Sequence, residues 1–189
     1  MPNMTNSTVI LVAIVVVIAA VAIALAWSYQ QRRRRVVLRE RFGPEYDRTV
    51  QAVGTTGKAD ALLEERAARV AKYHIRELNA DEARRFAAAW RAIQAKFVDD
   101  PSAAVTEADA LVTEVMTARG YPMTDWDHRV EDLTVEHANV VHHYRAAREI
   151  ALRHQRRAAS TEELRQALVH YRELFGDLLG PVDTARRTA

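Results

Sequence analysis

The chain has 189 residues, with 27 Lys and Arg against 25 Asp and Glu, and it contains no cysteine. The missing cysteines exclude disulfides, thiolate metal ligands and a cysteine nucleophile. Glycine and proline are scarce, at 6 and 5 residues, and this composition favours helices over sheets.

The pI near 9.1 is in the range of many nucleic-acid-binding proteins, so the distribution of the charge matters. Residues 1–31 carry no charged side chain, and Arg32–Arg35 are four consecutive arginines. Residues 36–189 hold the other 23 basic residues together with all 25 acidic ones. A nucleic-acid-binding domain concentrates positive charge on one face, and residues 36–189 have no such block. We therefore expect no nucleic-acid partner.

An apolar run, Val9–Trp27, dominates the N-terminal part of the chain. Its 19 residues include no charged residue and no Gly, Pro, Asn or Gln, so a helix made from them has no polar face. At about 1.5 Å rise per residue this helix is about 28 Å long, close to the roughly 30 Å hydrocarbon core of a bilayer. The run predicts one transmembrane helix at 9–27.

A cleavable signal peptide is the alternative interpretation of this run. The preceding segment, MPNMTNST, lacks Lys and Arg, and the run exceeds the roughly 7–15 apolar residues of a signal peptide. The motifs Ala22–Ala24 and Ala24–Ala26 nevertheless fit a small-x-small cleavage site. We expect an uncleaved anchor and keep export after cleavage as the alternative.

The flanks of the span predict its orientation. Lys and Arg near the ends of a span stay in the cytoplasm, and Trp and Tyr gather at the membrane interface. Trp27 and Tyr29 fit that interface. The C-terminal flank then carries the basic collar, Arg32, Arg33, Arg34 and Arg35. We predict a single-pass inner-membrane protein with its N-terminus outside, its C-terminal domain in the cytoplasm, and arginines that can contact anionic lipid.

The organisation expected for the whole chain rests on these signals. We expect a short tail at 1–8, the span at 9–27, a collar, stalk and short helix at 28–57, a helical bundle at 58–180 and a disordered tail at 181–189. The stalk, Val36–Phe42, continues the span helix until Gly43-Pro44 interrupts it. Pro44 then opens a short helix at 45–53.

Helix signals continue along the bundle region. A loop at 54–57 precedes a helix at 59–74, whose apolar stripe is Leu63, Ala67, Val70 and His74. Asn79 with Glu82 is a capping box. The helix that it starts carries the best core candidates, Ala83, Phe86, Trp90, Ile93 and Phe97.

The C-terminal part repeats these signals. Asp100-Pro101 starts a helix that Gly120 ends. Thr124 and Thr134 can each cap a helix, so 125–157 is one helix or two. Ser160 with Glu163 caps a last helix that closes at Gly180-Pro181. The short connections predict an all-α fold, in which the transmembrane helix is followed by an antiparallel bundle of five or six helices.

Two motifs resemble ligand sites but lack the required spacing. Gly54-Thr-Thr-Gly57-Lys58 has two residues between its glycines where a phosphate loop has four. No His-Glu-x-x-His or Glu-x-x-His motif is present to bind a metal. Five of the histidines are spread over the C-terminal half, at His128, His137, His142, His143 and His154. We expect no metal and no cofactor.

His137 is the most informative polar residue because it falls on the apolar stripe of the 125–157 segment. A buried imidazole needs a hydrogen-bond partner. We expect His137 to be buried and to pair with a carboxylate such as Asp109 or Asp132. With Trp90 nearby, this buried polar site is the alternative location for a small-molecule or ion sensor.

Several segments resemble a family of bacterial membrane-anchored or "secreted" helical proteins. They are Arg41–Arg48, Trp90–Asp99, Ala108–Val112, Val115–Pro122 and Tyr144-Arg145, within 36–180. The resemblance implies one helical fold and assigns no activity. With no catalytic constellation in the sequence, we expect a membrane-anchored interaction or scaffolding module with an unidentified protein partner, and not an enzyme.

Overall fold

The computed structural model describes residues 4–122, 125–156 and 159–180, and every regular element in these ranges is a helix. The chain divides into two compact units, Met1–Glu40 and Arg41–Ala189. Because every regular element in the described ranges is a helix, the predicted all-helical class is confirmed. Seven helices follow the first one in the described residues: the short helix expected at 45–53, and six in the region where five or six were predicted.

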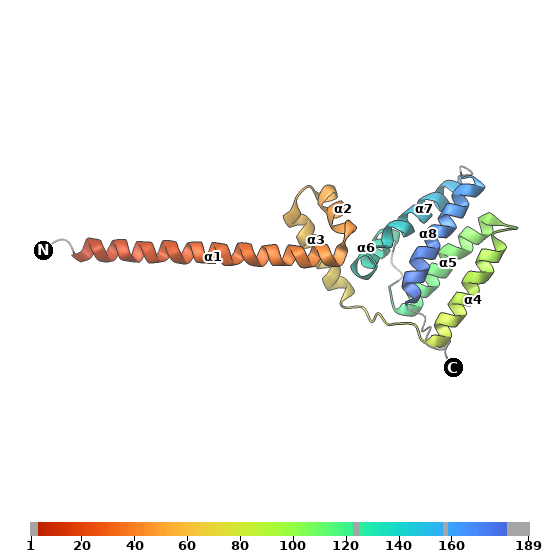
Figure 1. Ribbon diagram of the computed structural model, residues 1–189, viewed down its shortest axis with the longest axis horizontal. Coiled ribbons are helices and arrows are strands. Elements are labelled where there is room, and N and C mark those ends of the chain that lie inside the picture. The colour runs from red at the N-terminus through yellow and green to blue at the C-terminus, as the bar shows by residue number, and fades with distance from the viewer. Residues whose placement is uncertain (1–3, 123–124, 157–158, 181–189) are drawn as a thin grey trace, which may run out of the picture. The chain divides into compact units, whose positions relative to one another are not determined.

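The first helix, α1, runs without a break over Met4–Phe42 (Figure 1). In the described residues it is the one helix long and apolar enough to cross a membrane, a property that N-terminal signal sequences share. None of its most apolar window is buried within the protein. The continuation through 36–42 confirms the predicted stalk.

A short helical pair comes next, α2 (Pro44–Val53) and α3 (Thr56–Val70). Gly43 takes the left-handed φ of 47° that separates α1 from α2, as the Gly-Pro signal predicted. The pair has its own small core, in which the Tyr46 hydroxyl donates to Asp60 at 2.7 Å. The buried residues of α3 are Ala59, Leu63, Arg66 and Val70.

The bounds predicted for α3, 59–74, were wrong at both ends, because the helix spans Thr56–Val70. Thr55 caps the helix, so it starts inside the expected 54–57 loop. After Val70 the chain tightens into i→i−3 bonds, including Tyr73 N–H to the Val70 carbonyl at 2.9 Å. His74 is therefore outside the helix and exposed, and the buried stripe passes through Arg66 instead of Ala67.

The next two helices match their local signals, α4 (Ala80–Lys96) and α5 (Pro101–Arg119). The capping box of Asn79 and Glu82 is formed, and Asp100 caps α5. The Glu82 pKa is lowered to about 2 by hydrogen bonds from Arg76 and from the Asn79 backbone. Gly120 ends α5 in the left-handed region. The predicted α4 stripe is buried except for Phe97, which is half-buried.

The segment at 125–157 forms two helices, α6 (Trp126–Glu136) and α7 (Val141–Gln155). Asp125 caps α6; the proposed cap Thr124 lies outside the described residues. The break occurs at His137 and not at Thr134: the His137 N–H still donates to the Leu133 carbonyl at 2.8 Å, and the backbone leaves the helix at His137, with φ −121° and ψ 33°. The prediction that His137 sits inside a helical stripe was wrong, although the residue is buried.

The last helix, α8 (Thr161–Leu179), begins at the predicted capping box of Ser160 and Glu163. It packs against α5 and α7, and α4 packs against α5 (Figure 1). One continuous core joins α4–α8, and its largest fully buried side chains include Tyr144, Tyr171, Met116, Leu133 and Leu174. The predicted tail at 181–189 lies outside the described residues.

Gly120→Ala should destabilise the protein. Gly120 has φ of +92°, and a Cβ there would lie 2.4 Å from the His74 carbonyl oxygen. We expect a loss of about 2–3 kcal/mol from backbone strain and this clash. The matched control is Gly176→Ala in α8, where a Cβ meets open space and helix propensity should add about 0.5–1 kcal/mol. Thermal unfolding of the full chain in non-ionic detergent checks both; equal effects would contradict the assignment.

Candidate functional site

A cavity of about 490 Å³ lies where α2 and α3 meet α6 and α7. Part of its wall is apolar, contributed by Ala52, Val53, Leu62, Trp126 and Val130. The rest is polar and charged, contributed by Glu45, Arg48, Thr49, Arg66, Asp127, Glu131 and Arg145. The volume falls within the roughly 300–1,000 Å³ typical of small-molecule sites.

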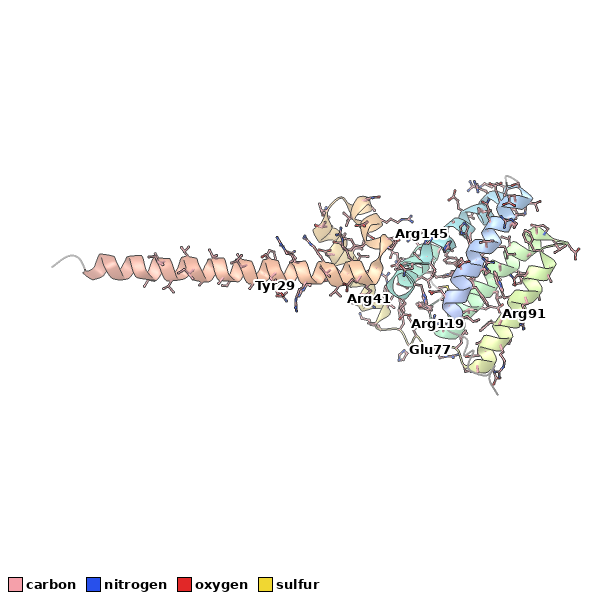
Figure 2. All side chains as sticks on the ribbon, in the orientation of Figure 1. Tyr29, Arg41, Glu77, Arg91, Arg119 and Arg145 are labelled. Atoms are coloured by element: carbon pink, nitrogen blue, oxygen red, sulfur yellow. The ribbon has the colours of Figure 1, made fainter. Side chains whose placement is uncertain are left out.

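Glu45 is the central carboxylate of this wall and is 6% exposed. Pro44 at the first position of α2 places Glu45 in the first turn, where the helix dipole favours a negative charge. Arg145 of α7, labelled in Figure 2, donates to both Glu45 oxygens at 2.7 and 2.8 Å. This bidentate geometry is the strongest form of an arginine–carboxylate pair.

Arg66 of α3 lies between two carboxylates and is 8% exposed. Its Nη2 donates to Glu131 at 2.9 Å, and its Nη1 is 3.9 Å from Glu45. Within the described residues its Nε and Nη1 have no hydrogen-bond partner. An unsatisfied buried donor costs about 1–3 kcal/mol, so this guanidinium is only partly compensated.

The charge network continues along α3 and α6. Arg69 donates to Glu131 at 3.1 Å and to Asp132 at 2.9 Å. The Tyr73 hydroxyl donates to the second Asp132 oxygen at 3.0 Å. Burial, followed by this contact with Asp132, raises the Tyr73 pKa. Asp132 is thus a buried acceptor with two donors, and it joins α6 to the end of α3.

These ion pairs mark a boundary inside the second unit. The core of α4–α8 contains no residue of α2 or α3 among the described residues. Near the same boundary, the Arg41 Nε donates to the Val135 carbonyl at 3.3 Å. Charge pairs and hydrogen bonds thus join α2 and α3 to α6 and α7, and the cavity lies at this junction.

His137 pairs with a carboxylate, but not with either that we predicted. Its Nδ1 is 2.5 Å from Asp177, and its Nε2 is 3.1 Å from Arg119. Arg119 also donates to the Leu178 carbonyl at 3.2 Å. A second cavity of about 230 Å³ adjoins this group and is also lined by Glu77. The correction has a simple cause: the break at His137 directs its ring toward α5 and α8.

The other residues of the predicted polar site have separate partners. Asp109 accepts from Tyr171 at 2.9 Å and from Arg148 at 3.0 Å. Burial and the charge of Asp109 raise the Tyr171 pKa. Trp90 stacks on Phe175 with ring centroids 4.9 Å apart. Trp90, Asp109 and His137 thus take part in three different sets of contacts among the described residues.

The predicted membrane-interface residues all lie on α1. Trp27 and Tyr29 are largely exposed, at 68% and 61%. The Arg33 guanidinium lies over the Tyr29 ring, 5.3 Å from its centroid. The collar continues without interruption through Arg32, Arg33, Arg34 and Arg35.

Histidines far apart in sequence meet between α7 and α8. The Nδ1 atoms of His143 and His170 are 2.9 Å apart, and the His142 ring lies against the His143 ring at a tilt of 37°, with centroids 3.9 Å apart. The pKa values of His143 and His170 are lowered by burial first and then by the charge of neighbouring histidines, with Glu173 opposing the shift. In the described ranges, no group of three or more His, Cys, Asp or Glu is placed to hold a metal ion.

The cavity was not predicted, although the sequence contains a signal for it. Arg66 is three residues after Leu63 and four before Val70, so a charged residue occupies the buried face of an amphipathic helix. Such a residue needs a buried partner of opposite charge. The sequence does not reveal that the partners are Glu131, 65 residues away, and Glu45.

Comparison with known proteins adds nothing to this geometry: no family model, curated protein or solved structure matches the chain. The chemistry of the cavity wall indicates what the site can bind. The cavity combines an apolar wall with three arginines and three carboxylates, so its polar side offers both hydrogen-bond donors and acceptors.

Glu45→Ala should cost about 3 kcal/mol of unfolding free energy, because it leaves the buried Arg66 and the half-buried Arg145 without that carboxylate. Replacing both partners, by Glu45→Met with Arg145→Met, should recover part of the loss, because no unpaired charge is left between them. Arg172→Ala breaks an exposed pair with Glu173 and should leave the unfolding midpoint unchanged. The network assignment fails if Glu45→Ala is no more destabilising than Arg172→Ala in denaturant unfolding.

The His143–His170 pair should make stability depend on pH. Both pKa values are lowered in the folded protein, so the unfolded chain binds more protons as the pH falls through about 6.5. Wild type should lose stability between about pH 7.5 and 5.5, and His170→Gln should lose less. The exposed control His74→Gln should follow wild type. An unchanged pH slope in His170→Gln would contradict this account.

Proposed function

We propose that the protein is a single-pass membrane protein whose C-terminal helices form an antiparallel bundle in the cytoplasm and act as an interaction or scaffolding module. The observation that carries the proposal is the exposed apolar surface of α1. Its side chains from Val12 to Leu25 face outward, whereas among the described residues after Val37 the exposed large hydrophobic side chains are Val98 and Leu152. An apolar helix of this length joined to a water-compatible domain suits a membrane anchor.

The basic collar supports the orientation. Arg32–Arg35 directly follow the apolar segment on the same helix, and positive charge is retained in the cytoplasm. Contact with anionic lipid would add about 1 kcal/mol per arginine near the surface. In this orientation α2–α8 face the cytoplasm of an inner membrane.

The outward face of α4 is the surface that we propose for partner binding. This helix packs chiefly against α5, which leaves its other side open. Exposed Arg85 and Arg91 make no ion pair with a carboxylate within the described part of the chain, and Figure 2 labels Arg91 on α4. Exposed arginines on an open helix face suit a partner surface rich in acidic residues.

Ligand sensing is the second candidate function, and the junction cavity favours it. The cavity holds a buried, partly unsatisfied arginine, and it lies between two packed parts of the unit. Small-molecule sites often occupy such boundaries. The candidate site is thus at Arg66 and Trp126 and no longer near Trp90, Asp109 and His137.

Protease protection of a C-terminal tag tests whether α1 anchors the protein with its C-terminal domain in the cytoplasm. With a C-terminal tag, the full-length product in spheroplasts should be protected from added protease. Changing Arg32–Arg35 to glutamate should expose the tag, because the orienting charge is lost. A digested wild-type product, or one shortened by about 26 residues as signal cleavage would give, would contradict a cytoplasmic domain.

Crosslinking in the same cells tests the interaction role. A photoreactive residue at Arg91 should give a discrete adduct in the membrane fraction, and the additional change Arg85→Glu should weaken it. A photoreactive residue at the exposed Arg172 of α8 is the matched control. Failure of Arg91 to give more adduct than Arg172 would overturn the proposed face.

A further inference from the structure

Two imidazole nitrogens face each other between α7 and α8. Nδ1 of His143 is 2.9 Å from Nδ1 of His170, and the ring centroids are 5.1 Å apart. Between two neutral rings, one Nδ1 donates its proton and the other accepts it. If each ring carries its proton on Nε2 instead, both Nδ1 atoms present a lone pair. One change of tautomer therefore converts the hydrogen-bonded pair into two adjacent metal-binding nitrogens.

The spacing of the two nitrogens suits a single metal ion. Zinc–nitrogen bonds to histidine are about 2.0–2.1 Å long, so two such ligands lie about 2.9–3.4 Å apart when their bonds meet at about 90–110°. The observed 2.9 Å is at the lower end of this range. The rings are tilted by 36° to each other, and small side-chain rotations turn their lone pairs from one another toward a shared ion.

The surroundings keep both rings neutral and favour a cation beside them. Burial is the main cause that lowers the pKa of His143 and of His170, so near neutral pH both rings are in the unprotonated form that binds metals. The Glu173 carboxylate, one turn after His170 on α8, opposes the lowering of both pKa values, because it attracts positive charge at the two rings. A metal ion supplies that positive charge without protonating either ring.

The pair lies within reach of solvent. His143 and His170 are half-buried, and the neighbouring His142 and Glu173 are exposed. Within the described part of the chain, neither ring of the pair has a buried nitrogen without a hydrogen-bond partner. An ion can therefore enter from the surface, and the Nε2 protons of the bound form can face water.

We propose that His143 and His170 bind one divalent transition-metal ion, such as zinc or nickel, through their Nδ1 atoms, and that the ion links α7 to α8. No third His, Cys, Asp or Glu of the described residues is placed to share the ion, so water completes its coordination. Imidazole nitrogen suits these ions, whereas Mg²⁺ and Ca²⁺ prefer oxygen ligands. The inference is independent of the interaction role and of the junction cavity.

The ion would be a removable link inside the bundle. Helix α7 packs against α8, and each helix supplies one of the two ligands. An ion that binds the folded pair and not the unfolded chain stabilises the fold by an amount that grows with its concentration. Sequence spacing does not reveal the site, because the two histidines are 27 residues apart and lie on different helices.

The test uses the full chain in non-ionic detergent, purified with a tag that contains no histidine and treated with EDTA. Titration calorimetry with ZnCl2 or NiCl2 should show one ion bound per chain. Zinc at about 100 times its Kd should raise the unfolding midpoint by at least about 4 °C, and MgCl2 should leave it unchanged. With one equivalent of Cu²⁺, the electron paramagnetic resonance spectrum should show two coordinating imidazole nitrogens.

Variants locate the ion. His143→Gln and His170→Gln should each weaken zinc binding by at least about tenfold and leave one imidazole on Cu²⁺. Glutamine keeps a hydrogen-bonding side chain but lacks the imidazole nitrogen. The matched control is His74→Gln, which removes an exposed histidine outside the helices and should bind zinc as wild type does. Thermal unfolding in EDTA shows whether each variant is folded.

Saturable binding of one ion, weakened in both glutamine variants and retained in His74→Gln, supports the proposal. Zinc binding that persists in both variants, an equal response to Mg²⁺, or a wild-type copper spectrum with fewer than two imidazole nitrogens would overturn it. These are the results expected if the two histidines are joined only by a hydrogen bond. The stoichiometry, the Mg²⁺ comparison and the copper spectrum are measured on wild type, so the test does not depend on either variant folding.

Discussion

The Glu45 carboxylate is removed from water at the start of α2, and its position constrains much of the second unit. Arg145 holds it through both oxygens from α7, and Arg66 approaches it from α3. A buried carboxylate without partners would cost several kcal/mol, so these three helices must meet in one arrangement for the charges to be compensated. The same requirement continues through Glu131 and Asp132 to the end of α3.

Ion pairs and apolar packing differ in how much change in side-chain geometry they tolerate. Hydrophobic packing within the core shared by α4, α5, α6, α7 and α8 tolerates many side-chain arrangements of similar volume, and burial of apolar surface is its main stabilising contribution. Ion pairs at the α2–α3 boundary are directional, and they weaken once their geometry is lost. A boundary of this kind can bind a ligand or partner at modest cost, because the ligand replaces or completes polar contacts and does not have to open a dry core.

The N-terminal unit obeys a different constraint. The backbone N–H and C=O groups inside α1 are hydrogen-bonded to one another. Its side chains therefore determine whether water or an apolar medium surrounds the helix more favourably. Its apolar side chains find no protein surface to cover them among the described residues, and an apolar medium removes that exposure. In the proposed membrane-anchored arrangement, the collar would set which side of the bilayer the remaining chain occupies.

The sequence by itself determined the features that depend on local interactions. The starts of α4, α5 and α8 were predictable at Asn79, Asp100 and Ser160, because each cap acts over about three residues. The end of α5 at Gly120 was predictable for the same reason, and the apolar character of α1 needs only composition. Tertiary structure decided which charges meet. Glu45 and Arg145 are 100 residues apart, and no local pattern pairs them. It also decided the break at His137, where Asp177 and Arg119 hold the ring and the helical periodicity of 125–157 gives way to contacts from α8 and α5.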